Sequence, residues 1–269
     1  QAHGPAFSSV LTFDLRLMKL LMLLALCLSC LPSRAAPYLP TSGAQVIETM
    51  PRRSDPAQQD IERLRKQLRS SPNDARLAAT LARRYIDIGR SEHDPRYFGY
   101  AQAALAPWWN STTPPHEVRL LRATLLQSTH HFPEAMADLD AITAADPSNA
   151  QAWLTRATVQ TVRGDYDGAT ASCARLSSLA SQLASFACLG NVASVTGRLA
   201  ASEQLLKQTL ARNADAPPEE QTWALTLLAE MATRRGDAAS AEERYRRALA
   251  ASPRDSYLLG AYADFLLDH

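Results

Sequence analysis

The side chains that could do chemistry in this sequence form no catalytic or metal-binding pattern. His93, His116 and the pair His130-His131 fall in predicted turns and loops, and no HExxH or paired CxxC motif links them to carboxylates. The acidic pairs at 219–220 and 242–243 are neighbours along predicted helices, so their side chains point in different directions. No glycine-rich phosphate-binding loop occurs. We therefore expect no catalytic residue, no metal ligand, no cofactor and no enzymatic activity.

The chain before residue 36 has the organisation of a secretory signal. Residues 1–17 precede Met18, where we expect translation to begin, and Lys19 leads into an apolar run from Leu20 to Leu31. Small residues then surround a cleavage position, which completes the three-part pattern of a signal peptide over residues 18–35. The apolar run is also short for a bilayer span. We expect the mature chain to be exported, to a bacterial periplasm.

Cys30 offers an alternative fate for this signal, because lipid can be attached to a cysteine that follows a small residue. Ser29 fits the preceding position, but Cys27 stands where a leucine-like residue is required. Lipid attachment is therefore the second choice. Apart from the signal peptide or such a lipid, we expect no contact with a membrane.

Residues 36–56 are expected to form a linker. Four prolines occur in this segment, with serine, threonine and glycine between them. Proline blocks helix formation and favours extended backbone. The folded part of the chain should therefore begin near residue 57.

Cys173 and Cys188 are the two thiols that would remain after export. An oxidising compartment favours a bond between them. They fall on consecutive predicted helices that should be antiparallel neighbours, but counting from the turn leaves them about one helical turn out of step. Two interpretations stay open: a disulfide, or two small residues buried in the core.

Composition favours a helical protein and argues against a nucleic-acid binder. The 28 lysines and arginines nearly balance the 27 aspartates and glutamates, and no block of a single sign occurs. The hydrophobic share of 46% is enough for a folded core. Alanine, leucine, arginine, glutamate and glutamine dominate, and these residues lose little side-chain freedom in a helix. We expect an all-α fold and no nucleic-acid partner.

A spacing of small residues recurs along the second part of the sequence. In the clearest copy, Ala157 is followed seven residues later by Gly164 and five residues after that by Ala169. The equivalent first positions of the copies are Ala123, Ala157, Gly190, Ala229 and Ala263. Their numbers differ by 34, 33, 39 and 34 residues. Five copies in register indicate an internal repeat.

This pattern resembles the tetratricopeptide repeat (TPR), and the resemblance covers residues 57–269. Small residues allow two antiparallel helices to touch. Gly164 can adopt the left-handed backbone that ends the first helix, and Asp165 can cap the second. One hairpin cannot bury its own apolar face, so the copies must stack. The resemblance implies a right-handed α-solenoid with a half-repeat, about five full repeats, and a last helix that is truncated or caps the stack.

The first full repeat is irregular. Ala82 and Gly89 begin a copy whose second helix is expected to be delayed by the inserted residues 91–100. The densest aromatic cluster of the chain lies nearby, at Tyr97, Phe98, Tyr100, Trp108 and Trp109. These rings either pack the irregular repeat or form an exposed patch for a partner.

The last copy stops at His269, before the glycine expected at its turn, while apolar residues of its helix still need cover. Either this helix caps the stack or the natural protein continues, and we expect continuation because a terminal helix normally presents a polar outer face.

The resemblance also implies a binding face. In TPR proteins the first helix of each hairpin lines a concave groove, and the residue after the small one points into it. These residues are Arg83, Thr124, Thr158, Asn191, Glu230 and Asp264. The row runs from basic through neutral to acidic, and Trp223 and Tyr257 are available as apolar anchors. Apart from Asn191, the lysine and asparagine set that grips a C-terminal carboxylate in some TPR proteins is missing.

We therefore expect an exported scaffold or adaptor that binds a protein or peptide on this face. Two alternatives stay open. The chain could be the repeat portion of a longer protein with an enzymatic or membrane module beyond residue 269, or it could be a lipid-anchored component of envelope assembly. The fold does not choose among the pathways that such scaffolds serve.

Overall fold

The computed structural model describes residues 40–42, 44–45, 56–92 and 94–269, whose regular structure is entirely helical. The all-α prediction is therefore confirmed for these residues. The chain divides into two compact units, Gln1–Arg53 and Ser54–His269, and every described helix belongs to the second. The expected signal peptide and most of the expected linker lie outside the described residues. Among the described helices, none has the length and apolar character needed to cross a membrane.

Ten of the described helices form five hairpins. These are α3 (Ala75–Ser91) with α4 (Arg96–Ala104), α6 (His116–Ser128) with α7 (Phe132–Ala145), α8 (Ala150–Val162) with α9 (Tyr166–Arg175), α10 (Gln182–Val195) with α11 (Leu199–Arg212), and α12 (Pro218–Arg234) with α13 (Ala238–Ala251). The other elements are α2 (Pro56–Ser70), α5 (Ala106–Trp109), the 3₁₀ turn η1 (Leu176–Ser178) and α14 (Ser256–Asp268).

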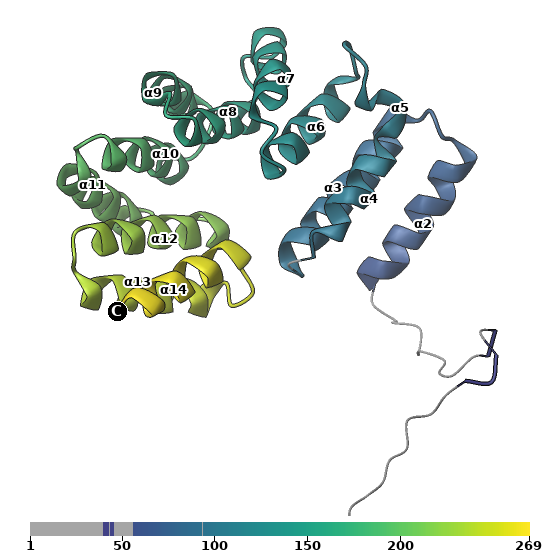
Figure 1. Ribbon diagram of the computed structural model, residues 1–269. Helices are drawn as coiled ribbons and strands as arrows, with labels where there is room; N and C mark the ends of the chain where they lie inside the picture. Colours follow the sequence, from purple (N-terminus) through teal and green to yellow (C-terminus); the bar gives the residue numbers. More distant parts are fainter. Residues whose placement is uncertain (1–39, 43, 46–55, 93) are drawn as a thin grey trace, which may run out of the picture. The chain divides into compact units, whose positions relative to one another are not determined.

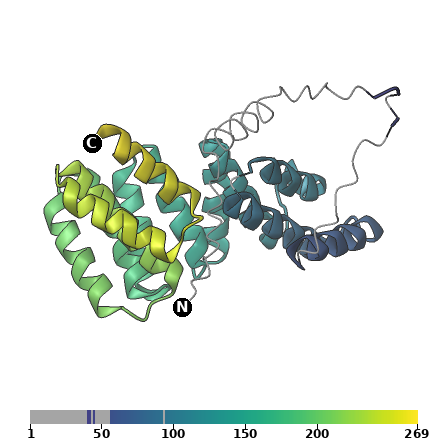
Figure 2. The same ribbon diagram turned by 90° about the horizontal axis from the view of Figure 1, so that it is seen from below.

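Each hairpin packs against the next one along the chain. The first helices contact one another in the order α3, α6, α8, α10, α12 and α14, and second helices such as α7 and α9 contact the first helix of the following hairpin. The helices of this unit therefore follow one another along a curved row, in which α6, α8 and α10 lie on the inner side and α7, α9 and α11 on the outer side (Figure 1). The last three helices, α12, α13 and α14, contact one another and lie side by side in the view from below (Figure 2).

Four of the hairpin turns contain a residue with left-handed backbone, at the positions that the repeat spacing predicts. Gly164, Gly197 and Gly236 have φ of 78°, 87° and 78°, and His130 takes the same role with φ of 61°. In the α8–α9 hairpin, the Asp165 side chain then accepts a hydrogen bond of 3.0 Å from the backbone N–H of Gly168. The predicted turn and cap are both confirmed for this hairpin.

The first hairpin departs from the prediction. Gly89 is not a turn residue, because α3 continues through it to Ser91. A Cβ atom at Gly89 would lie 3.1 Å from the Phe98 ring, so a larger residue there would require the ring to move by a few tenths of an ångström. The second helix begins at Arg96, inside the segment expected to be an insertion.

Small residues lie where the helices of a hairpin meet. Ala157 of α8 and Ala169 of α9 are buried in one apolar cluster. Ala229 of α12 and Ala241 of α13 are fully buried in another. Side chains of this size let the two backbones approach closely, and larger residues fill the space on either side. The core is therefore a series of clusters along the row of helices.

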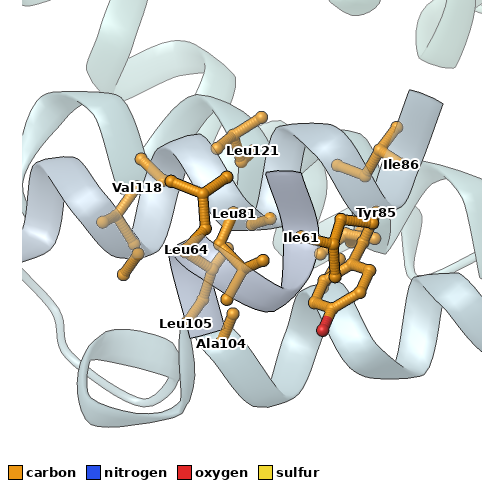
Figure 3. Close-up of a cluster of buried hydrophobic side chains, with 14 residues drawn as sticks. Ile61, Leu64, Leu81, Tyr85, Ile86, Ala104, Leu105, Val118 and Leu121 are labelled. Atoms are coloured by element: carbon orange, nitrogen blue, oxygen red, sulfur yellow. The ribbon is translucent and has the colours of Figure 1, made fainter. Parts of the chain in front are cut away.

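The first of these clusters joins the lone helix α2 to the repeats (Figure 3). Ile61 and Leu64 of α2 are buried against Leu81 and Tyr85 of α3, and Val118 of α6 lies in the same cluster. Burial of aliphatic side chains of this size stabilises a fold by roughly 1.5–3 kcal/mol each. α2 therefore covers the apolar face that the first hairpin would otherwise expose.

The two tryptophans of the aromatic cluster pack the irregular repeat. Trp108 and Trp109 are half-buried against the first apolar cluster. The Arg122 guanidinium donates hydrogen bonds of 3.2 and 2.7 Å to their carbonyl oxygens and pairs with Asp138 at 2.6 Å. These contacts favour the packing interpretation over an exposed patch for the tryptophans, whereas Tyr100 is exposed.

A buried carboxylate connects the last two hairpins. Glu203 of α11, which is only 3% exposed, accepts hydrogen bonds from Arg244 of α13 at 3.0 Å and from Lys207 at 2.7 Å. Burial alone would raise the pKa of Glu203, but hydrogen bonds from Lys207 and Arg244 outweigh burial and hold that pKa below its usual range. The ion pair therefore stabilises the fold above about pH 4 and is lost as pH falls through the lowered pKa.

The last helix is covered on one face. Leu258 and Phe265 of α14 are buried, and Phe265 packs against the ring of Tyr245 at a centroid distance of 5.5 Å. Tyr257 and Leu266 are exposed.

The turn glycines give a test of the repeat geometry. Gly164→Ala should lower the free energy of unfolding by about 1 kcal/mol, because alanine is strained at φ of 78° although no atom lies within 4 Å of the added Cβ. Gly99→Ala is the matched control, since its Cβ also meets nothing within 4 Å but lies inside α4. It should raise stability by about 0.5–1 kcal/mol. Urea denaturation followed by circular dichroism measures both, and equal effects would contradict the assigned turn.

Candidate partner-binding face

The predicted groove residues lie on the first helices of successive hairpins and on α14. Arg83 is on α3, Thr124 on α6, Thr158 on α8, Asn191 on α10, Glu230 on α12 and Asp264 on α14. Two hollows open on these helices, and together they contain five of these six residues. The repeat pattern therefore brings Arg83, Thr124 and Thr158 together in one hollow, and Glu230 and Asp264 together in the other.

The first hollow, called here the basic hollow, has a volume of about 260 Å³ and is lined by α3, α6 and α8. Each helix supplies four side chains: Arg83, Ile86, Asp87 and Arg90; Leu120, Leu121, Thr124 and Gln127; Gln151, Leu154, Thr155 and Thr158. On α3 and α8 these residues are spaced by three, four and seven positions, which is one face of a helix. Three neighbouring repeats thus present one continuous surface.

The basic hollow combines apolar and charged groups. Ile86 and Leu121 are buried, and Leu154 is half-buried. Arg83 and Arg90 are exposed and have no ion pair or side-chain hydrogen bond within the described ranges, and neither does Asp87. Two guanidinium groups and one carboxylate leave the lining with a net positive charge.

The threonine hydroxyls in this hollow already have acceptors. Thr124 donates to the Leu120 carbonyl oxygen at 2.9 Å, and Thr158 donates to the Leu154 carbonyl oxygen at 3.0 Å. A free threonine hydroxyl could donate a hydrogen bond to a peptide and also accept one from it. Here each hydroxyl hydrogen is used within its own helix, so only the acceptor positions stay open.

The second hollow, called here the acidic hollow, lies between α12 and α14 and has a volume of about 500 Å³. Glu230, Asp264 and Asp268 line it, with Arg234 as its basic residue. The hydroxyl of Tyr257, which also lines this hollow, donates a hydrogen bond of 2.7 Å to Glu230. The basic-to-acidic order of the predicted row is therefore present in the two hollows.

Asn191 and Trp223 lie outside both hollows. The Asn191 side chain is half-buried on α10. Trp223 is half-buried near the start of α12 and packs against two apolar clusters, one around Leu183 and one around Cys173. The structure thus places Trp223 in the packing between repeats, with part of its side chain still exposed. Its role as an anchor stays a prediction.

Sequence reasoning missed several residues that line the basic hollow. Asp87 and Arg90 follow Arg83 by four and seven positions, Gln127 follows Thr124 by three, and Gln151 precedes Thr158 by seven. Helical periodicity from each predicted position could have found them.

The structure joins Cys173 and Cys188 in a disulfide, with their Cα atoms 5.5 Å apart. The bond links α9 to α10 and therefore connects two successive hairpins. The expected offset of one helical turn is absent. Counting assumed a symmetric turn, whereas α9 continues into the 3₁₀ turn η1 and an extended Ser181 before α10 begins.

The histidines do not assemble a metal site in the described part of the chain. His130 occupies a left-handed turn and packs edge-on against Phe132. His116 was predicted to lie in a loop, but it is the first residue of α6. His93 lies outside the described residues. Among those described, no group of three or more histidine, cysteine or acidic side chains could hold a metal ion.

Comparison with known proteins identifies the fold. No protein-family model matches the sequence, and no curated protein matches it. Among solved structures, a thermophilic TPR protein from Thermus thermophilus is similar at 19% identity with a TM-score of 0.54, covering 72% of this chain and 99% of that one. A TPR protein from Parabacteroides merdae is similar at 13% identity with a TM-score of 0.59, covering 78% of each chain. PilW, a type IV pilus biogenesis factor, is similar at 18% identity with a TM-score of 0.51, covering 77% of this chain and 90% of that one.

These likenesses define the class of fold that the hairpins and turns indicated. The described helices form an all-α solenoid of the TPR type. At these identities the comparisons establish the fold alone.

The disulfide gives a quantitative prediction for stability. Replacing both cysteines, as Cys173→Ala with Cys188→Ala, should lower the free energy of unfolding by about 3 kcal/mol, because the bond closes a segment of 15 residues in the unfolded chain. The measurement is urea denaturation of the double variant and of the parent protein, each with and without reductant. Reductant should bring the parent close to the double variant and leave the double variant unchanged. Free thiols in the unfolded, unreduced parent would contradict the bond.

Proposed function

We propose that this protein is an exported scaffold that binds an extended segment of a partner protein on the inner face of its solenoid, without chemistry of its own. The observation that carries the proposal is the basic hollow, in which three successive repeats contribute one lining. Its aliphatic floor, in which Ile86 and Leu121 are buried, and its unpaired charged rim are the groups that peptide-binding grooves use for anchoring and orientation.

The proposal concerns the face as a whole. Glu230 and Asp264 extend the same surface into the acidic hollow, and Asn191 lies on the helix row between the two hollows. A segment that runs along the row would meet basic, neutral and acidic side chains in turn. Such a gradient favours one orientation of a charged ligand.

Site-specific crosslinking tests this face in the cells that make the protein. A photoreactive residue placed at Thr158, in the basic hollow, should capture a partner polypeptide. The matched control is Thr170, an exposed threonine on α9 of the same hairpin that lines neither hollow. The Thr158 adduct should disappear when Thr124→Trp fills the hollow from α6. Equal capture from both positions, or capture that survives Thr124→Trp, would overturn the proposed face.

Export is the second part of the proposal. It is supported by the pattern of basic, apolar and small residues over residues 18–35 and by the disulfide, since such bonds persist in oxidising compartments.

N-terminal sequencing of the protein purified after synthesis from Met18 checks export directly. The mature chain should begin at Ala36, and Ala35→Leu should block processing because the cleavage site requires a small residue. A mature chain that begins at a modified Cys30 would indicate lipid attachment, and a chain that keeps its apolar run would contradict export.

A further inference from the structure

The hydrogen-bond donors left open in the basic hollow define what it can bind. The hydroxyl hydrogens of Thr124, Thr155 and Thr158 are all given to carbonyl oxygens of their own helices. The amide of Gln151 donates to the Thr155 hydroxyl at 3.2 Å. Most neutral donors of the lining are therefore already satisfied.

The donors that stay open are mainly charged. Arg83 and Arg90 stand two turns apart on α3, and Asp87 lies between them on the same side of the helix. None of these three side chains has an ion pair among the described residues. α6 and α8 add no acidic side chain to the lining. A guanidinium forms its strongest hydrogen bonds with a carboxylate or another oxyanion. The rim therefore favours binding of an anion.

The floor of the basic hollow indicates a second property of the ligand, an apolar group. Ile86 and Leu121 are buried beneath the rim, and Leu120 and Leu154 are half-buried beside them. A cavity of about 260 Å³ with such a floor accommodates an aliphatic side chain. An anion that carries an apolar group next to its charge would therefore contact both the floor and the charged rim.

We infer that the basic hollow recognises an internal peptide segment in which an aspartate or glutamate stands beside an aliphatic residue. The carboxylate pairs with Arg83 and Arg90, and the aliphatic side chain packs on the floor of Ile86, Leu120, Leu121 and Leu154. This inference rests on the proposed function and specifies its ligand. A C-terminal carboxylate is the rival source of the same chemistry, and the test separates the two.

Selection from a displayed library of random peptides tests this inference. Peptides of about 20 residues, which reach up to about 70 Å when extended, are displayed in one library with both ends fused and in another with a free C-terminus. Binders to the whole protein are sorted by their loss of binding to Thr158→Trp, which fills the hollow. Thr170→Trp on α9 is the control for the added tryptophan.

Peptides from the library with both ends fused should share an acidic residue next to an aliphatic one. Their affinity should fall about tenfold for the double variant Arg83→Gln with Arg90→Gln, since two solvent-exposed ion pairs are lost. The variant Arg163→Gln with Arg254→Gln removes the same net charge from exposed positions outside both hollows and should leave affinity within about twofold. Circular dichroism confirms that each variant is folded.

The other outcomes separate the inference from the proposed function. One such outcome is a set of peptides that lose binding to Thr158→Trp but contain no acidic residue and bind the arginine variant with unchanged affinity. This result would overturn the inference and leave the proposed binding face intact. Binders found only in the library with a free C-terminus would show that the carboxylate is terminal, which also overturns it. If no peptide is sensitive to Thr158→Trp, both the inference and the proposed function fail.

Discussion

Close contact between paired helices at small side chains is the constraint on which this fold depends. Ala157 against Ala169 and Ala229 against Ala241 set the spacing of two backbones, and bulkier residues at these positions would separate the helices. Because each hairpin then leaves one apolar face open, it is stable only beside its neighbours. The same stacking aligns α3, α6 and α8, so the lining of the basic hollow is a direct consequence of core packing.

The periodic part of this architecture was predictable because each position has one dominant physical role. A residue at a hairpin turn must adopt positive φ, so Gly164, Gly197 and Gly236 recur in step, and even His130 could be placed there by register. Gly89 shows the limit of this reasoning. Glycine serves left-handed turns and close approaches equally well, and the sequence does not say that the Phe98 ring lies against it.

The candidate binding face was predictable to a different degree. Register placed Arg83, Thr124 and Thr158 on one surface, and helical geometry carries that placement to Asp87 and Arg90. The hydrogen bonds of the threonines could not be predicted from the sequence, because a hydroxyl can donate to its own helix or to a ligand. The surroundings of Trp223 could not be predicted either, since an aromatic residue on a first helix can face a groove or the next repeat. The offset of the cysteines depended on a connection that departs from regular geometry.

The covalent link between α9 and α10 has a mechanical consequence. A solenoid held only by contacts between neighbours can be peeled apart from either end, one hairpin after another. At Cys173 and Cys188 tension along the backbone passes through the sulfur atoms and bypasses the 15-residue span between them. The junction between α9 and α10 therefore resists extension, while hairpins toward the two ends of the row can still separate.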